Sequence, residues 1–381
     1  MNSKNNTATL TSLSVENQEN IRLTCKAINA QQLTAQPLTV RAILKKLADN
    51  DAFELGFLAG NQRIIDPMDI KKVVEVIEIL SSECAVASSA YMVNCVFAAS
   101  IIALLGSDEQ RATFLPKIKS TEIQFSFSLT EPLAGSDASG ITTSVIATEH
   151  GYLLNGEKTY ATGASDADYL LVVARIQGAQ NRELSVFVVP TNTVGVKIER
   201  LRSLPGHVHP SCHIVLENVE LSKDAVLGGE GLAWNVLKMT GLLERLVVAV
   251  SSVGLASSIV KRATEYAKQR HQFGQVISSF QSIQHMLVDM AITERTMRLM
   301  SQDAVNTLVE GKDASEQILM AKCYCSEQLQ VLLAQGMRIM GGRAFFDFEE
   351  MSRYYLEAPL SLYAGGTIEV HKKLIARFLG I

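Results

Sequence analysis

The sequence contains few cysteines and no paired arrangement of them. Six cysteines are scattered along 381 residues, and no C-x-x-C motif occurs. This pattern argues against a disulfide scaffold or a zinc knuckle, and we expect a reducing, cytoplasmic compartment. Glycine and proline, at 24 and 8 residues, are too rare for a collagen-like or low-complexity chain. Hydrophobic residues make up 47% of the chain, which is enough to bury a large core.

The chain also lacks an excess of either charge. The 35 basic and 39 acidic residues leave a net charge of −4, and no long basic run is present. This balance argues against nucleic acid or an anionic membrane as the main partner. The N-terminal residues contain no apolar signal region.

One long uncharged run resembles a membrane span. The stretch from Cys84 to Gly106 carries no formal charge and is long enough to cross a bilayer. It includes Ser88, Ser89 and Asn94, and no cluster of Lys or Arg flanks it. We therefore predict a central helix buried among other helices.

The order of hydrophobic patterns divides the chain into three parts. Residues 17–122 show helical spacing, residues 121–229 show short strands and turns, and helical spacing returns after Gly231. Asn155-Gly156 predicts a tight turn between two strands. The last part contains four predicted helices, at 234–270, 280–310, 314–340 and 367–379. We expect an α+β chain with domains at 1–122, 123–229 and 230–381.

Several common catalytic motifs are missing. No G-x-S-x-G elbow, P-loop or G-x-G-x-x-G after a strand occurs, which removes the usual hydrolase, NTPase and Rossmann interpretations. His207, His209 and His213 share one loop but lack carboxylate or thiolate partners, so we predict no metal site.

Glu244 is the most informative single residue. On a helix, its neighbours on the same face are all small or apolar: Thr240, Gly241, Val247 and Val248. Burial there predicts a raised pKa and a more basic carboxylate. The alternative is a structural charge that reaches solvent or is satisfied by Arg245. The local pattern leaves both interpretations open.

Three polar loops are suited to binding an anion or a heteroaromatic ring, namely residues 129–137 (LTEPLAGSD), 158–165 and 270–274 (RHQFG). Each alone is also typical of an ordinary turn.

Together, four motifs in order resemble the acyl-CoA dehydrogenase family. LTEPLAGSD resembles its "TEPgaGSD" flavin loop, and GEKTYATGASDADYLLVVAR resembles the strand that follows it. RHQFGQVISSFQSIQHMLVDM resembles its "R-x-x-F-G" segment, and RIMGGRAFF with GGTIEVHKKLIAR resembles its closing elements. The resemblance implies an N-terminal helical domain, a middle antiparallel β-domain and a C-terminal four-helix bundle.

The resemblance also implies the cofactor and its ligands. FAD would bind between subunits of a homotetramer, so that some contacts come from a neighbouring subunit. The implied cofactor residues are Leu129, Thr130, Gly135, Ser136, Tyr160, Thr162, Arg270, Phe273, Gln281, Arg338, Gly341, Gly342, Thr367 and Glu369. Arg338 stands where glutamine is more usual in the family. Arg245, Tyr363 and Gly365 are expected to contact the substrate.

The position of the catalytic base departs from the family's commoner pattern. Most members carry a glutamate in a "Y-E-G-T" element, but here the element reads YAGGT, from Tyr363 to Thr367. A minority, isovaleryl-CoA dehydrogenases among them, carry the base in an "L-E-R-L" helix. This chain has L-E-R-L at residues 243–246, so the resemblance implies that Glu244 removes the α-proton while the flavin accepts a hydride.

The same features resemble the branch that oxidises prolyl groups tethered to carrier proteins in bacterial natural-product pathways, as in anatoxin biosynthesis. A short- or branched-chain acyl-CoA is the alternative substrate. An inactive FAD-binding scaffold and an enzyme of nitro compounds or monooxygenation are the other functions considered. The sequence leaves open whether oxygen or an electron-transfer flavoprotein reoxidises the flavin.

Overall fold

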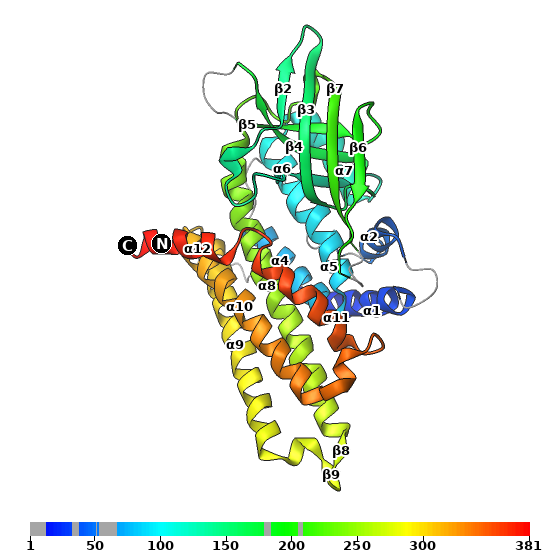
Figure 1. The fold of residues 1–381 in the computed structure, drawn as a ribbon, viewed down its shortest axis with the longest axis vertical. Helices are drawn as coiled ribbons and strands as arrows, with labels where there is room; N and C mark the ends of the chain where they lie inside the picture. The colour runs from blue at the N-terminus through cyan, green and yellow to red at the C-terminus, as the bar shows by residue number, and fades with distance from the viewer. Residues whose placement is uncertain (1–12, 33–37, 51, 53–66, 179–183, 205–208) are drawn as a thin grey trace, which may run out of the picture.

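The computed structural model describes residues 13–32, 38–50, 52, 67–178, 184–204 and 209–381. Three parts follow one another along the long axis of the molecule (Figure 1). The β-domain lies at one end, the N-terminal helices lie beside its base, and the long C-terminal helices extend to the other end. The predicted helical–β–helical order is confirmed.

The N-terminal part is helical. It comprises α1 (Val15–Gln32), α2 (Val40–Ala48), α4 (Pro67–Glu83), α5 (Ala85–Tyr91), a π-helical stretch η1 (Met92–Ala98), α6 (Ala99–Leu105) and α7 (Asp108–Lys119). Ser107 begins α7 with a capping box, because its hydroxyl and the Gln110 side chain satisfy each other's backbone N–H.

The uncharged run from Cys84 to Gly106 forms the continuous stretch α5–η1–α6. This stretch and the segment Leu237–Gln269 are long and apolar enough to cross a membrane, yet both are mostly buried inside the protein. The prediction of a buried central helix is confirmed. Within η1, the Oδ1 atom of Asn94 accepts a hydrogen bond of 3.0 Å from the Phe125 backbone N–H. This bond fixes the start of β1 against the central helix.

The middle part is a seven-stranded sheet. Its strands are β1 (Phe125–Ser128), β2 (Ser144–Ala147), β3 (Gly151–Thr162), β4 (Tyr169–Ile176), β5 (Leu184–Pro190), β6 (Val196–Arg200) and β7 (Ser211–Ser222), in the order β1-β4-β2-β3-β7-β6 with β5 on β4. Most pairs are antiparallel, as expected, but β4 pairs in parallel with both β1 and β2. The sheet is therefore mixed.

The predicted turn at Asn155-Gly156 is wrong. These residues lie inside the continuous strand β3, where the register against β7 shifts between Leu154 and Gly156. Gly156 has a φ of +150°, and a Cβ atom there would lie 2.4 Å from Oγ1 of Thr143. Glycine is needed here because the strand has a β-bulge and passes close to Thr143, and not because the chain turns in a hairpin.

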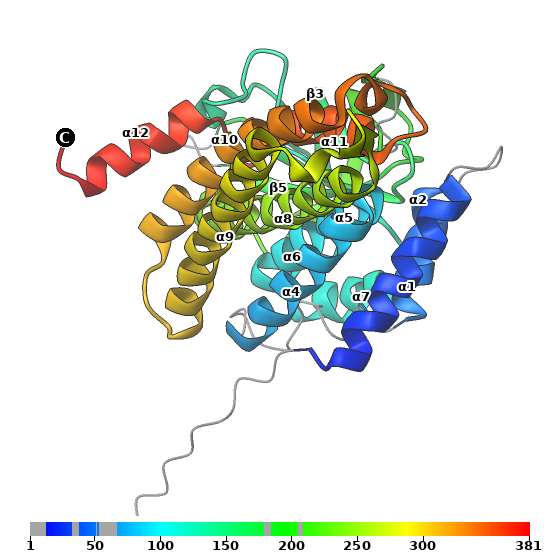
Figure 2. The same cartoon turned by 90° about the horizontal axis from the view of Figure 1, so that it is seen from below.

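The C-terminal part is built on three long helices, α8 (Ala233–Gln269), α9 (Gln281–Val309) and α10 (Ser315–Met340). A small hairpin, β8 (His271–Gln272) and β9 (Gln275–Val276), joins α8 to α9. The short helices α11 (Glu350–Glu357) and α12 (Ile368–Phe378) pack against α10 in place of a long fourth helix. Figure 2 shows α12 projecting on the side opposite α1 and α2. Each of the four predicted helices ends within one residue of the observed bounds, whereas α11 was not predicted.

Candidate active site

The loop at residues 129–137 is fixed to β3 by a buried ion pair between Glu131 and Lys158. Nζ of Lys158, on β3, donates to the carbonyl of Leu129 at 3.0 Å and to Oε1 of Glu131 at 2.9 Å. The Glu131 carboxylate also accepts from the backbone N–H groups of Thr142 at 2.7 Å and Thr143 at 2.9 Å. Both charged side chains are buried, so the pair fixes the loop without facing solvent.

The hydrogen bonds keep this carboxylate ionised. Burial alone would raise the pKa of Glu131, but hydrogen bonds from Thr143, Lys158 and Thr142 lower it to about 2. Burial lowers the pKa of Lys158 to about 8, although Glu131 opposes this shift. The paired charges together make a rigid base for the loop.

The loop lies directly beside the end of β3. The Thr159 backbone N–H donates to the Thr130 carbonyl at 2.9 Å, and the Ser126 hydroxyl donates to the Thr162 carbonyl at 2.8 Å. Six predicted flavin residues therefore lie on two neighbouring segments, the loop after β1 and the C-terminal end of β3: Leu129, Thr130, Gly135, Ser136, Tyr160 and Thr162.

The loop after β1 and the end of β3 are suited to binding a flavin. Gly135 and Ser136 are exposed, and a Cβ atom at Gly135 would meet only Thr130 Cγ2, at 3.9 Å, so a cofactor backbone can approach closely. The Tyr160 ring is 69% exposed although it follows buried residues of β3. Its φ of +56° is unusual for an aromatic residue, and such strained residues cluster at functional sites.

Glu244 lies on α8 beside the turn formed by residues 362–366, called here the 362–366 turn. A Cβ atom at Gly365 would lie 3.4 Å from Cγ of Glu244. Burial raises the pKa of Glu244, whereas the charges of Arg245 and Lys322 and a hydrogen bond with the Gly365 backbone oppose the increase. The predicted direction of this pKa shift is confirmed. A side chain at position 365 and the side chain of Glu244 would therefore occupy neighbouring space.

Arg245 also contacts the 362–366 turn. Its Nε lies 3.2 Å from the Gly365 carbonyl and 3.0 Å from Nε2 of His371, and it can donate to both. His371 is fully buried, and burial together with the charges of Lys322 and Arg245 lowers its pKa to about 4. The imidazole is therefore neutral at physiological pH.

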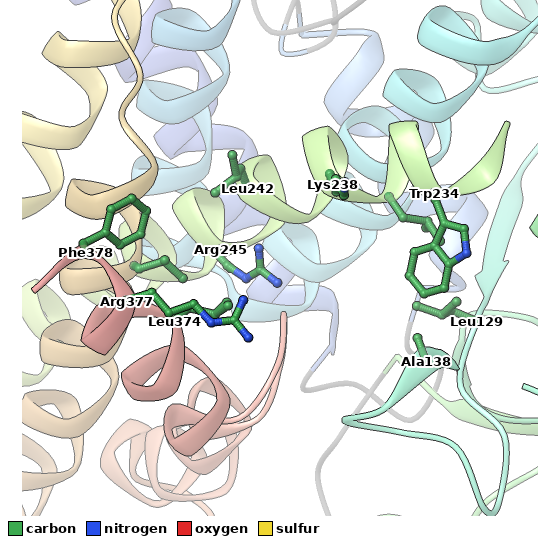
Figure 3. A pocket seen from close by; sticks show the side chains of 11 residues that line it. Leu129, Ala138, Trp234, Lys238, Leu242, Arg245, Leu374, Arg377 and Phe378 are labelled. Carbon is green, nitrogen blue, oxygen red and sulfur yellow. The ribbon is translucent and has the colours of Figure 1, made fainter. Parts of the chain in front are cut away.

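A pocket of about 490 Å³ is lined by Leu129 of the flavin-loop group and by Arg245 of the Glu244 group. It is lined by Leu129, Ala138, Trp234, Leu237, Lys238, Leu242, Arg245, Leu319, Leu374, Arg377 and Phe378. In Figure 3, Arg245, Leu374, Arg377 and Phe378 lie toward one side of the view, and Leu129, Ala138 and Trp234 lie toward the other. Glu244 is not among the lining residues. The pocket offers apolar walls and three cationic side chains, which suits an acyl chain joined to an anionic carrier.

The remaining predicted residues near this site come from α12 and the turn before it. Thr367 caps α12 by accepting from the Val370 N–H at 3.3 Å, and Glu369 is exposed in the first turn. Tyr363 is exposed.

A second set of predicted cofactor residues lies at the far end of the helices. It comprises Arg270, Phe273, Gln281, Arg338, Gly341 and Gly342, all exposed, and the β8–β9 hairpin marks this end in Figure 1. Arg270 follows Glu244 by 26 positions on one helix, so at 1.5 Å per residue the two lie about 39 Å apart. Phe273 is 92% exposed and has a φ of +51°. Within one subunit this set is remote from the pocket.

The histidines predicted not to bind a metal are His207, His209 and His213. His207 lies outside the described residues. Nδ1 of His209 lies 2.9 Å from the Ser89 hydroxyl, and Nε2 of His213 lies 2.7 Å from the Glu157 carboxylate. In the described part of the chain, no group of three or more potential metal ligands occurs.

Glu131 and Lys158 lie in loops predicted to bind an anion or a ring, but neither they nor Lys322 and His371 had a predicted role of their own. Glu131 belongs to the recognised loop motif, and a lysine inside a β-strand is a weak signal of a buried partner. Lys322 and His371 give no such signal, because only the fold brings α10 and α12 to Glu244.

Comparison with known proteins agrees with this architecture. Three families match in order: Acyl-CoA dehydrogenase, N-terminal domain, at residues 18–122; middle domain, at residues 126–219; and C-terminal domain, at residues 230–380. Glutaryl-CoA dehydrogenase of Desulfococcus multivorans is 32% identical over 274 residues, which cover 71% of this chain and 70% of that protein.

Solved structures share the fold over nearly the whole chain. Acyl-CoA dehydrogenase from Geobacillus kaustophilus superposes with a TM-score of 0.85 and 25% identity, covering 97% of this chain and 99% of that one. PigA with FAD and proline also gives a TM-score of 0.85, at 23% identity, covering 97% and 98%. The chain therefore belongs to the acyl-CoA dehydrogenase family, as an FAD-dependent oxidoreductase that dehydrogenates a CH–CH bond of an acyl thioester.

Proposed function

We propose that this enzyme oxidises a prolyl group tethered as a thioester to a carrier protein, with Glu244 as the base that removes the α-proton. The observation that carries the assignment of the base is the contact between Glu244 and Gly365. This chain has no carboxylate at position 365, and the carboxylate of α8 lies against that position instead. Burial makes the Glu244 carboxylate more basic, which suits a general base.

Different residues of the chain would bind the cofactor, remove the proton and contact the substrate. Bound FAD supplies a hydride acceptor for the β-carbon of the substrate. The Leu129–Ser136 loop and the Tyr160–Thr162 segment hold the flavin ring, and Thr367 and Glu369 contact the rest of the cofactor. Glu244 accepts the α-proton, while a hydrogen bond from the Gly365 backbone and the charge of Arg245 favour its ionised carboxylate. Tyr363 borders the substrate.

The carrier arm fits the pocket by charge and shape. Its apolar lining accommodates a pantetheine chain, and the side chains of Lys238, Arg245 and Arg377 provide cations for the phosphate of the arm. The PigA structure holds FAD and proline, but at 23% identity its likeness concerns the fold alone. A short- or branched-chain acyl-CoA carries the same arm and is the second candidate.

A substrate panel tests this proposal. The purified holoenzyme is mixed without oxygen with prolyl-carrier protein, butyryl-CoA or isovaleryl-CoA, and the flavin absorbance is followed. We expect the fastest bleaching with prolyl-carrier protein. Faster bleaching with either CoA ester would overturn the prolyl assignment in favour of an acyl-CoA substrate. If none of the thioesters bleaches the flavin, the inactive scaffold becomes the better interpretation. Mixing the reduced enzyme with air or with an electron-transfer flavoprotein then identifies the acceptor.

We further propose that the active unit is a homotetramer in which each cofactor is shared. Arg270 and Phe273 lie too far from the pocket of their own subunit to reach the same flavin ring, given the separation of about 39 Å along α8. One face of α9 also exposes Val288, Ile292 and Leu299, whose spacing places them along a single stripe. A neighbouring subunit would cover this stripe and receive the hairpin.

Replacing Arg270 by alanine should weaken FAD retention. The substitution removes a charge-assisted contact with cofactor bound mainly to a neighbouring subunit. We expect the variant to lose flavin on dilution and gel filtration under conditions in which the unaltered protein stays yellow. Lys197→Ala, on β6 and away from α9, is a control for the loss of one exposed cation. Full flavin retention and an intact oligomer in the Arg270 variant would contradict the shared site.

Removing metals should leave activity unchanged. His209 and His213 are each engaged by a side chain of another element, so we expect no stoichiometric zinc in the active protein. Elemental analysis and thioester-dependent flavin bleaching after chelator treatment check this. Stoichiometric zinc whose removal abolishes bleaching would be the opposite result.

A further inference from the structure

Lys322, on α10, is a fully buried lysine close to the proposed base. Its Nζ donates to the Gly366 carbonyl at 3.1 Å and to the Leu362 carbonyl at 3.4 Å. Among the residues that the structure describes, no carboxylate forms an ion pair with it. A buried ammonium held only by two carbonyl groups is costly to desolvate, so its presence calls for an explanation.

The position of Lys322 links it to the active site from a third element. Leu319, one turn earlier on the same face of α10, lines the pocket. The two carbonyls that accept from Lys322 belong to the 362–366 turn, which contacts Glu244 through Gly365. The charge of Lys322 acts on Glu244 and favours its carboxylate form.

We propose that Lys322 is a positioning residue for Glu244: its ammonium group holds the 362–366 turn against α8 and stabilises the ionised carboxylate of the base. The proposal rests on the proposed role of Glu244. It explains why a charge is buried here, because a base that is partly buried and desolvated is kept ionised by a nearby cation.

The other titratable groups around Lys322 hold constant charges near neutral pH. Arg245 on α8 is a cation, and His371 on α12, with a pKa of about 4, is neutral. Burial raises the pKa of the Cys323 thiol, so it is neutral, and backbone and Thr367 hydrogen bonds lower the pKa of Glu369, so it is ionised. Between about pH 5.5 and 8, changes in this cluster come from Glu244 and from Lys322, whose pKa burial lowers to about 8.

The test compares pH profiles of flavin reduction. The holoenzyme and its Lys322→Met and Lys322→Arg variants are mixed without oxygen with the thioester of the panel that bleaches the unaltered enzyme fastest. Flavin reduction should rise with pH as Glu244 ionises. In Lys322→Met we expect this rise at higher pH, so that the rate at the midpoint of the unaltered enzyme falls roughly tenfold, an effect typical of losing one neighbouring opposite charge. The rate should recover at alkaline pH.

Two variants control for other effects. Lys322→Arg keeps the charge and should retain the profile of the unaltered enzyme below about pH 8, where Lys322 is itself charged. Lys372→Met removes an exposed lysine of α12 that pairs with Glu327 across to α10, and it should leave the profile unchanged. Flavin content is measured for every variant, and Lys322→Gln, which keeps a donor without charge, replaces Lys322→Met if that variant does not hold FAD.

The outcomes separate this proposal from the one on which it rests. If Glu244→Gln abolishes flavin reduction but Lys322→Met gives the unaltered profile, or a uniform decrease at every pH, Lys322 does not support the base. If Glu244→Gln reduces its flavin at the rate of the unaltered enzyme, Glu244 is not the base, and the proposed role of Lys322 is then also wrong. A shifted profile that arginine restores supports both.

Discussion

Replacing Glu244 by glutamine is expected to slow flavin reduction by thioester at least about 100-fold, the lower range for a positioned general base. Glutamine has nearly the same shape but cannot accept the α-proton. The fold, FAD content and substrate binding should be retained, because the amide can still occupy the space beside Gly365. Only the transition state contains the moving proton, so the loss should appear in the reductive half-reaction. Stopped-flow absorbance without oxygen measures it.

Glu75 provides a control for replacing a desolvated glutamate by glutamine elsewhere in the protein. Burial also raises the pKa of Glu75, on α4, where its carboxylate accepts from the Leu13 backbone N–H. Glu75→Gln should therefore keep the flavin reduction rate of the unaltered enzyme. An unaltered rate in Glu244→Gln would return Glu244 to the role of a buried structural charge.

Adding Gly365→Glu to the Glu244→Gln variant tests whether a carboxylate at position 365 can replace that of Glu244 as the base. A carboxylate at position 365 would start 3.4 Å from the side chain at position 244, so partial recovery of the rate is expected. Recovery should be incomplete, because Gly365 has a φ of +69° and a side chain there costs about 1–2 kcal/mol. A double variant no faster than Glu244→Gln, with full FAD content, would show that position 365 does not face the reacting carbon.

Breaking the Glu131–Lys158 pair should have the second large effect, on stability and on FAD content. In Lys158→Met the Glu131 carboxylate stays buried without its cation, and removing one partner of a buried pair costs about 3–5 kcal/mol. The Leu129 carbonyl also loses its donor, so the flavin loop should loosen. We expect a lower midpoint of thermal unfolding and loss of flavin during purification.

The exposed pair Lys197–Glu217 supplies the control. It joins β6 to β7 at 2.7 Å on the surface, and Lys197→Met should change the free energy of unfolding by at most about 1 kcal/mol. Equal thermal midpoints for the Lys158 and Lys197 variants would contradict the role of the buried pair.

The pH dependence of stability follows from Glu131. Its folded pKa of about 2 lies below the unfolded value of 4.5, so its contribution is fully present above pH 4.5. The contribution is lost as the pH falls from 4.5 toward 2. Lys158→Met should reduce this loss in acid unfolding measurements, since the lysine is one of the groups that hold the Glu131 pKa down.

Much of the fold could be predicted because hydrophobic spacing is a local signal. The long helices α8, α9 and α10 repeat their apolar positions over many turns, and their ends were predicted within one residue. The short α11 has too few turns to give such a signal. The parallel pairing of β1 with β4 joins Phe125 to Tyr169, and no local pattern records which distant strand is the partner.

The candidate site could be predicted in part. The desolvation of Glu244 followed from its helical neighbours, and the resemblance directed attention to the 129–137 loop and the 362–366 turn. The contact of Gly365 with Glu244 could not be predicted from local sequence patterns, since the two residues are 121 positions apart in the chain. The buried Lys322 and His371 depend in the same way on the packing of α10 and α12 against α8.

The most direct test of the account is a single anaerobic mixing experiment with prolyl-carrier protein. The holoenzyme and Glu244→Gln are each mixed with one equivalent of substrate per flavin, and the acyl group is weighed by mass spectrometry after quenching. We expect the unaltered enzyme to bleach its flavin and to yield an acyl group lighter by two hydrogens, while Glu244→Gln does neither on that time scale. An unchanged acyl mass with the unaltered enzyme, or equal bleaching by both proteins, would contradict it.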